Sequence, residues 1–169
     1  PFSNVPSKIA KQISNIWKND LSFYKHKFIV KYNKSVKNLA SSPEFMQWKA
    51  AQFRYVVTSQ FLQDAKSKTT RVNLKVFDTI SEKDILNVSE LYSGDIRDFA
   101  HKYSDQIYNS ITKKKSIFTS KIYFVSDKYG TKKKMVKELF VMDFDGRNIK
   151  RLTNHRSIVI SPSVSHDNK

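Results

Sequence analysis

Two stretches of the chain repeat apolar residues with the period of an amphipathic helix. The first stripe consists of Ile9, Ile13, Ile16, Trp17 and Leu21. The second stripe consists of Ile96, Phe99, Ala100, Tyr103, Ile107 and Ile111. Because spacings of three and four residues place each set on one helix face, we predict helices of roughly four and roughly five turns that pack on a core.

A shorter helix and several strands are predicted around these two stripes. Ser42 and Pro43 begin a helix that we expect to continue to Gln52, because Ser caps free amides and Pro suits the first helical position. The remaining polar stretches, residues 31–40, 64–70 and 81–84, are expected to be loops or turns. Alternating or β-branched runs predict strands at residues 53–62, 71–78, 85–92 and 117–126.

The C-terminal part of the chain has the pattern of strand, turn and strand. Residues 138–143 alternate with a period of two, and Asp145-Gly146 follows. Asp-Gly is a strong turn signal because both residues tolerate a positive φ angle. An apolar run at residues 158–160 is limited as a strand by Pro162. Residues 165–169 carry another turn signal where the chain stops, so we expect a fragment of a longer protein.

Length and composition favour a globular chain with room for one domain and part of another. The chain has 169 residues, of which 39% are hydrophobic and 13% aromatic, so global disorder is not expected. No stretch reaches the roughly 20 apolar residues of a membrane span. The chain begins at Pro1 without a Met, so the lack of a signal peptide carries no information. Cysteine is absent, which excludes disulfides and thiolate metal sites.

The net charge of +16 comes almost entirely from lysine, since 25 of the 31 basic residues are Lys. A basic surface for nucleic acid or anionic lipid is one interpretation. A solvated, lysine-rich surface is the other. We favour the second, because specific phosphate and base recognition uses the planar fork of Arg, which is scarce here. The lysine triplets at residues 113–115 and 132–134 are therefore interpreted as a helix end and a basic hairpin loop.

The sequence contains none of the common catalytic or nucleotide-binding motifs, namely G-x-S-x-G, H-E-x-x-H, G-x-x-x-x-G-K-[ST] or G-x-G-x-x-G. The four histidines lie far apart, and His101 is interpreted as a hydrogen-bonded structural residue rather than a ligand. Asp143 and Asp145 could form a cation loop, but a turn stabilised by side chain to backbone hydrogen bonds is simpler. We predict no catalytic residue, no cofactor-binding residue, no metal ligand and no small-molecule substrate.

The C-terminal pattern resembles the blade repeat of the TolB β-propeller. Ser161, Pro162, Ser165, Asp167 and Lys169 match the second half of that repeat, whereas Val164, His166 and Asn168 replace its usual Trp, Pro and Gly. The first half of the repeat is matched by Val141, Met142, Asp143, Asp145, Gly146, Asn148, Arg151, Leu152 and Thr153.

The N-terminal part resembles the same family in the same order, and the resemblance implies a strand at residues 28–30 after the first helix. Pro1-Phe2 is similar to the end of a family strand, most of which is expected to lie upstream. Gln52, Ser59 and Lys113 stand where the family has glycine. The helix and the strand after it match at Arg97, Ala100, His101, Asp105, Thr112, Phe118, Ile122 and Val125.

The resemblance implies an α/β fold. Residues 1–112 would form an N-terminal α/β domain with a mixed β-sheet packed by helices, and residues 113–169 the first strands of a truncated β-propeller. It also implies a non-enzymatic, periplasmic protein of the Tol–Pal envelope system with roles in outer-membrane integrity, cell division and protein transport. The implied partners are the Pal lipoprotein and TolA, with peripheral association with the envelope. Arg156, in a His-Arg-Ser loop, is the candidate partner-binding residue; a structural hydrogen bond to loop carbonyls is its alternative role.

Two other classes of protein stay open at this stage. One is the β-propeller portion of a serine peptidase whose hydrolase domain lies outside the chain; the N-terminal domain argues against it. The other is a basic nucleic-acid-binding module, whose affinity for a duplex would fall steeply with salt. The preferred interpretation has no nucleic-acid partner.

Overall fold

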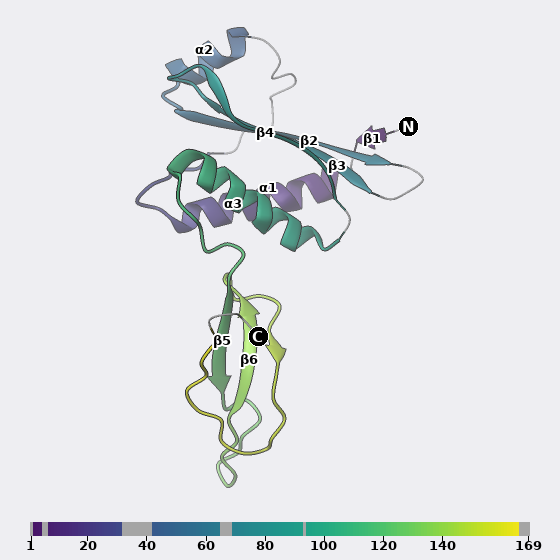
Figure 1. The fold of residues 1–169 in the computed structure, drawn as a ribbon, viewed down its shortest axis with the longest axis vertical. Helices are drawn as coiled ribbons and strands as arrows, with labels where there is room; N and C mark the ends of the chain where they lie inside the picture. The colour runs from purple at the N-terminus through teal and green to yellow at the C-terminus, as the bar shows by residue number, and fades with distance from the viewer. Residues whose placement is uncertain (1, 5–6, 32–41, 65–68, 93, 166–169) are drawn as a thin grey trace. The chain divides into compact units, whose positions relative to one another are not determined.

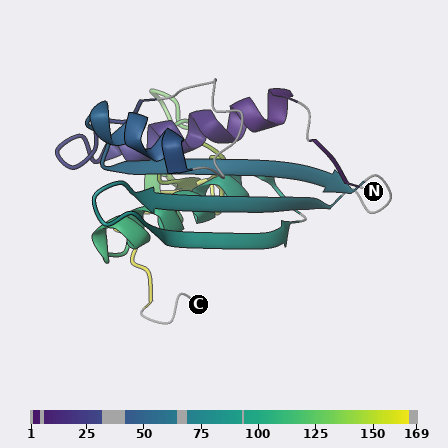
Figure 2. The same cartoon turned by 90° about the horizontal axis from the view of Figure 1, so that it is seen from above.

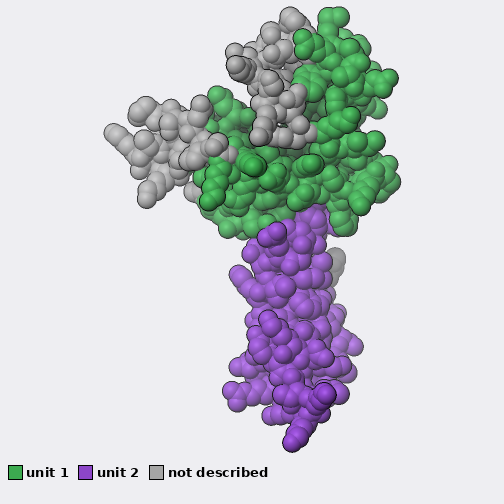
Figure 3. Space-filling view, turned by 180° about the vertical axis from the view of Figure 1, so that it is seen from behind, with its two compact units in different colours: residues 1–116 green, residues 117–169 purple. Residues whose placement is uncertain are grey.

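The computed structural model describes residues 2–4, 7–31, 42–64, 69–92 and 94–165. They divide into two compact units, Pro1–Ser116 and Ile117–Lys169, called unit 1 and unit 2 below (Figure 3). In the described ranges, every helix is too short or too polar to cross a membrane.

Unit 1 is built on a sheet of four strands in the order β1-β2-β3-β4 (Figure 1). Its strands are β1 (Phe2–Asn4), β2 (Tyr55–Asp64), β3 (Thr70–Asp78) and β4 (Lys83–Tyr92). The prediction of a mixed sheet was wrong, because each described pairing of these strands is antiparallel. The reason is connectivity: β2, β3 and β4 follow one another through short connections and lie side by side (Figure 2), whereas parallel neighbours need a long crossover.

Helices α1 (Ser7–Phe23) and α3 (Ile96–Thr112) cover one face of this sheet, and α2 (Ser42–Ala50) lies on the other face (Figure 1). Val72, Leu74 and Val76 alternate along β3 and are fully buried. The apolar stripes of α1 and α3 are buried as well, so both predicted helices and their core-facing role are confirmed. The buried members of the two stripes are Ile13, Ile16, Trp17, Leu21, Phe99, Ala100, Tyr103 and Ile107.

Both ends of α3 are capped. Asp95 is the N-cap, and its carboxylate accepts hydrogen bonds from the backbone amides of Arg97 at 2.7 Å and Asp98 at 3.3 Å. Lys113 is the C-cap, with φ of 58°, and its amide donates to the carbonyl of Asn109 at 2.8 Å. Gln52, after α2, also has a positive φ, 61°. Two positions where the family has glycine therefore keep the left-handed backbone that glycine favours.

Three expected strand segments are corrected by the structure. Residues 28–30 form no strand, because the turn that closes α1 continues to the amide of Phe28, which donates to the carbonyl of Tyr24 at 3.1 Å. The strand expected from residue 117 begins only at Lys121, after a turn in which the Ser120 amide donates to the Ile117 carbonyl. Residues 158–160 contribute a single bridge from Ile158 to Lys137. Most of the loop expected at residues 31–40 lies outside the described residues, as do parts of the turns expected at 64–70 and 165–169.

Unit 2 contains a three-stranded antiparallel sheet in the order β5-β6-β7. Its strands are β5 (Lys121–Ser126), β6 (Glu138–Asp143) and β7 (Lys150–Arg151). The Asp145-Gly146 turn joins β6 to β7, with Gly146 at φ of 80°. The described apolar side chains that unit 2 buries are Phe118, Val136 and Phe140. This small core leaves polar groups to organise much of the unit.

Candidate functional site

A buried carboxylate organises the loop of unit 2 that carries the predicted partner-binding residue. Glu138 begins β6, and its side chain is fully buried. The hydroxyl of Thr153 donates to its carboxylate at 2.5 Å and the guanidinium of Arg151 at 2.9 Å. The backbone amides of Arg156 and His155 donate to the same carboxylate at 2.7 and 3.2 Å. One side chain therefore holds Arg151 of β7 and three groups of the loop that follows it.

These contacts decide the charge of the Glu138 carboxyl. Burial by itself raises the pKa of a carboxylic acid. Here the hydrogen bonds from Thr153, the two loop amides and Arg151 outweigh burial and lower the pKa of Glu138 to about 2. The carboxylate is therefore ionised at neutral pH, and each of its hydrogen bonds is charge-assisted.

The structure places Arg156 at the surface with a fixed backbone. Its φ of 54° lies in the left-handed region, and the hydrogen bond to Glu138 holds it there. Its side chain is exposed, and no other described residue holds its guanidinium by a hydrogen bond or ion pair. Ile158 and Ile160, which follow in the chain, are 52% and 70% exposed. The arrangement presents one cation beside apolar side chains, a composition suited to a protein contact.

The Asp-Gly turn has the structure expected of a turn. The Gly146 amide donates to the carbonyl of Asp143 at 2.9 Å, and the Arg147 amide donates to the carboxylate of Asp145 at 3.2 Å. The Asp143 side chain is buried and accepts hydrogen bonds from Lys121 at 2.6 Å and Asn148 at 2.7 Å. The prediction of a hydrogen-bonded turn is therefore confirmed, and its carboxylates belong to the framework of the sheet.

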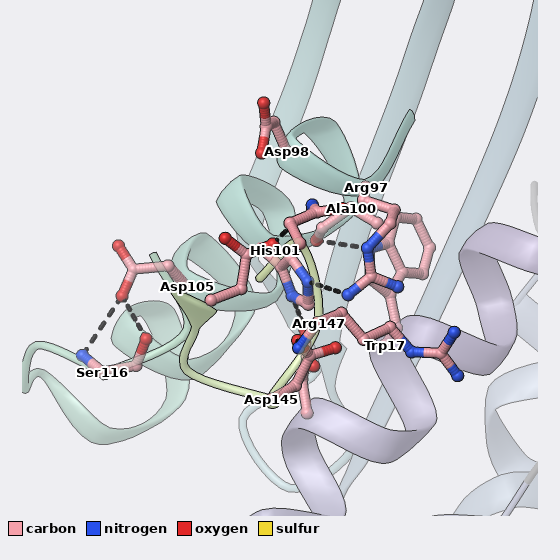
Figure 4. A network of polar contacts seen from close by, with 12 residues as sticks. Trp17, Arg97, Asp98, Ala100, His101, Asp105, Ser116, Asp145 and Arg147 are labelled. Carbon is pink, nitrogen blue, oxygen red and sulfur yellow. Dashed lines mark hydrogen bonds and ion pairs between the residues drawn. The ribbon is translucent and has the colours of Figure 1, made fainter. Parts of the chain in front are cut away.

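Unit 1 contains a buried polar cluster between α1 and α3 (Figure 4). The Nδ1 of His101 lies 2.8 Å from a carboxylate oxygen of Asp20, and its Nε2 lies 3.3 Å from a guanidinium nitrogen of Arg97. Since a guanidinium only donates hydrogen bonds, Nε2 accepts from Arg97, and Nδ1 carries the hydrogen that is donated to Asp20. The indole of Trp17 donates to the carbonyl of Ala100 at 3.0 Å. The predicted structural role of His101 is confirmed, because its contact with Asp20 connects α3 to α1.

Two further polar pairs extend from α3. The Lys27 ammonium donates to the hydroxyl of Tyr108 at 2.9 Å, which lowers the pKa of that phenol. Lys102 and the hydroxyl of Tyr103 both donate to the carboxylate of Glu90 at 2.9 Å and lower its pKa. Burial is the main cause that raises the pKa of Tyr103, followed by its bond to Glu90. These groups tie α3 to the end of α1 and to β4.

A groove of about 980 Å³ lies within unit 1 and is lined by α1, α3, β2 and residues 27–31. In the described part of the chain, β1 pairs with β2 only at residues 62–64, so residues 55–61 of β2 have an unpaired edge along the groove. Its lining is largely apolar and aromatic, and its charged members are cationic: Lys18, Lys27, Lys31 and Arg54. An unpaired strand edge beside an apolar groove is the geometry that β-strand addition uses.

Sequence reasoning singled out His101, Arg156 and the Asp-Gly turn but missed the buried roles of Asp20 and Glu138 and the groove. Asp20 lies on the apolar face of α1, between Trp17 and Leu21, where a charged residue needs a buried partner. Glu138 points to the same face of β6 as Phe140, which is the corresponding signal in a strand. Neither the groove nor its open strand edge has a signal in the sequence. In the described residues, no group of three or more His, Asp or Glu side chains is placed to hold a metal ion.

The fold and the site together define a protein with two units, an α/β unit and a β-sheet unit. A buried polar cluster connects two helices in the first unit, and another holds a loop in the second. Residues 1–85 match the family model described as the TolB amino-terminal domain. These residues make up just over half of the chain, and the match extends from β1 into β4. The chain belongs to the TolB family.

The similar proteins agree with this assignment. "Tol-Pal system protein TolB" of Geobacter metallireducens is 33% identical over 129 residues, which cover 75% of this chain and 28% of the relative. The protein of the same name from Orientia tsutsugamushi strain Ikeda is 29% identical over 98% of this chain and 37% of its own length. The crystal structure of TolB from Acinetobacter baumannii superposes with a TM-score of 0.71 at 27% identity, over 100% of this chain and 41% of that one. The chain thus spans about a third of the length of these relatives.

Proposed function

We propose that this chain forms part of a non-enzymatic, periplasmic component of the Tol–Pal system that acts by binding other proteins. The observation that carries the proposal is the structural likeness to a TolB protein over the whole of this chain, with a TM-score of 0.71. The names of the curated relatives place those proteins in the Tol–Pal system. The lack of common catalytic motifs in the sequence supports a role without catalysis.

We also propose a division of the chain according to this family. Residues 1–112 would be the N-terminal α/β domain, and residues 113–169 the first strands of a β-propeller. The proposal is supported by the blade-repeat residues of unit 2 and by its three antiparallel strands. A propeller blade has four strands and stacks on neighbouring blades, so the unit would be completed by residues outside this chain.

The protein encoded by the complete reading frame provides the test of the Tol–Pal role. We expect it to be recovered from the periplasmic fraction and to bind the Pal lipoprotein of the same organism in isothermal titration calorimetry. Loss of the gene should release periplasmic enzymes into the medium and delay cell division. A protein that stays in the cytoplasm, or that binds neither Pal nor TolA, contradicts the proposal.

Arg156 is proposed as a partner-binding residue of that protein. Its exposed side chain and fixed backbone support this role. We expect Arg156→Ala to weaken binding of the protein partner about thirtyfold or more, the range of an interface hot spot. The matched control is Lys150→Ala, which removes an exposed cation from β7 of the same unit. Equal affinities for the two variants would exclude a specific contribution from Arg156.

A further inference from the structure

The connection between β5 and β6 is the most basic exposed segment of unit 2. We call residues 127–137 the basic tip. It carries five lysines and one acidic residue, Asp127. Residues 131–135 are exposed one after another. The five lysines are Lys128, Lys132, Lys133, Lys134 and Lys137.

Backbone hydrogen bonds give the basic tip a defined shape. The amide of Thr131 donates to the carbonyl of Lys134 at 2.8 Å, and the amide of Lys134 donates back to the carbonyl of Thr131 at 3.2 Å. Lys132 and Lys133 therefore occupy the two central positions of a closed turn. At its base, the Gly130 amide donates to the carbonyl of Asp127 at 2.7 Å. Because the turn is already formed, little backbone entropy is lost when it binds a surface.

The side chains around this turn combine positive charge with an apolar group. Met135 directly follows the lysine triplet and is 63% exposed, whereas its neighbour Val136 is buried. Tyr129 of the tip is half exposed, and its ring stacks on Phe140 at a centroid distance of 6.1 Å. The guanidinium of Arg151 lies 4.4 Å from the centroid of the same ring. The basic tip therefore combines lysines at its end with the exposed thioether of Met135. This combination of cations and an apolar group is the composition of an interfacial membrane contact.

We propose that the basic tip docks on the surface of an anionic lipid bilayer. The lysines would lie against lipid phosphates, and Met135 would enter the boundary between headgroups and acyl chains. A fluid headgroup layer suits lysines, which act as point charges and need no fixed acceptor geometry. Nucleic acid is disfavoured, because the tip has no Arg for bidentate contacts and its one aromatic ring is already engaged by Phe140 and Arg151. The proposal adds a lipid contact to the proposed protein contacts and deepens the proposed association with the envelope.

Vesicle sedimentation of the full chain tests the proposal, and two lysine triplets provide a matched pair of variants. K132Q/K133Q/K134Q neutralises the basic tip, and K113Q/K114Q/K115Q makes the same change of charge in unit 1, where those side chains are also exposed. On vesicles of phosphatidylglycerol and phosphatidylethanolamine we expect the tip variant to bind about a hundredfold more weakly, at about fivefold for each lysine near the surface. The control variant should bind the same vesicles only a few-fold more weakly than the parent chain.

Three outcomes would overturn the proposal. The first is an equal loss for both triplets, which would show that net charge alone drives binding. The second is binding to phosphatidylcholine vesicles as strong as to the anionic ones. The third is that the chain binds a random DNA duplex as tightly as it binds the vesicles, and that this binding also requires the lysines of residues 132–134. The tip would then be a general site for polyanions.

A fluorescent variant tests insertion directly. In M135W we expect the added tryptophan to shift to shorter wavelength on anionic vesicles, whereas Trp17 and Trp48 in unit 1 supply a constant background. A spectrum unchanged by vesicles that do bind the protein would contradict an apolar contact at the tip.

Unfolding midpoints equal to that of the parent chain show that each variant is folded. Since the vesicles contain no protein, a negative result leaves the proposed Tol–Pal role untouched, and loss of Pal binding leaves the lipid proposal untouched.

Discussion

Units 1 and 2 of this chain are stabilised in different ways. Among the described residues, unit 1 buries fifteen hydrophobic side chains, whereas unit 2 buries three. Unit 2 leaves ten large hydrophobic residues exposed, against six in unit 1. Each unit buries two carboxylates, Asp20 and Asp78 in unit 1 and Glu138 and Asp143 in unit 2. Those of unit 2, each surrounded by hydrogen-bond donors, lie beside a much smaller apolar core. Burial of apolar surface dominates the first unit, and charge-assisted hydrogen bonds give the second unit its shape.

Native-state hydrogen exchange should show this difference most clearly. We expect amides of β3 and α3 in unit 1 to exchange only through global unfolding, and amides of β5, β6 and β7 to exchange at least a hundredfold faster. The physical reason is the small apolar core of unit 2, since local opening needs less free energy where little apolar surface is buried. Strong protection throughout residues 117–169 would show that hydrogen bonds alone stabilise unit 2 as well as a core stabilises unit 1.

Truncation of a core side chain in unit 1 should have the largest effect among single substitutions. Ile107 has no exposed surface, so we expect Ile107→Ala to lower the free energy of unfolding by about 2–5 kcal/mol. Urea denaturation followed by tryptophan fluorescence measures it, because both tryptophans of the chain lie in unit 1. The control is Ile80→Ala in unit 1, where the side chain is 63% exposed and a change within about 0.5 kcal/mol is expected.

The Asp20–His101 contact should contribute less than the core. Asp20→Ala leaves the Nδ1 hydrogen of a buried imidazole without its acceptor, and we expect a loss of about 1–3 kcal/mol in unfolding free energy. Asp20→Asn should recover part of this loss, because the amide oxygen still accepts the hydrogen bond. If both variants were as stable as the parent chain, the cluster would not fasten α1 to α3.

The Glu138 carboxylate should affect one loop and leave unit 1 unchanged. The pKa of Glu138 is lowered from 4.5 to about 2 in the folded chain, so its stabilising effect is complete above pH 4.5 and is lost as the pH falls toward 2. We expect the amides of His155 and Arg156 to lose protection over this range in nuclear magnetic resonance spectra. Glu138→Gln should show the same loss at neutral pH, with Asp145→Asn as the control. A loop that stays ordered in Glu138→Gln would assign its conformation to other contacts.

The left-handed C-cap of α3 should give the smallest effect, and a stabilising one. Lys113 adopts φ of 58°, a conformation that costs a non-glycine residue roughly 1–2 kcal/mol. Lys113→Gly relieves this cost but increases the entropy of the unfolded chain, so a net gain of up to about 1 kcal/mol is expected in urea denaturation. Lys114→Gly is the control and should not stabilise the protein. A destabilised Lys113→Gly variant would show that the lysine side chain contributes more than the backbone strain costs.

The sequence by itself determined which segments are helices, which residues of α1 and α3 face the core, and where the Asp-Gly turn lies. These features follow from local periodicity and turn chemistry, which act over a few residues. The residues that match the sequence pattern of the family were also sufficient to identify it. His101 could be interpreted correctly because its position on a helix flank favours a structural partner over a lone metal ligand.

Tertiary structure decided the features that depend on residues far apart in the chain. The partner of His101 is Asp20, 81 positions away, and the loop of Arg156 is fixed by Glu138, 18 positions away. The family resemblance implied a strand at residues 28–30, but a strand exists only where a neighbour supplies hydrogen bonds. The same reason applies to three other features: the antiparallel order of the sheet, the groove beside β2 and the low pKa of Glu138. Each depends on which segments pack together in the folded chain, and local sequence patterns do not specify that packing.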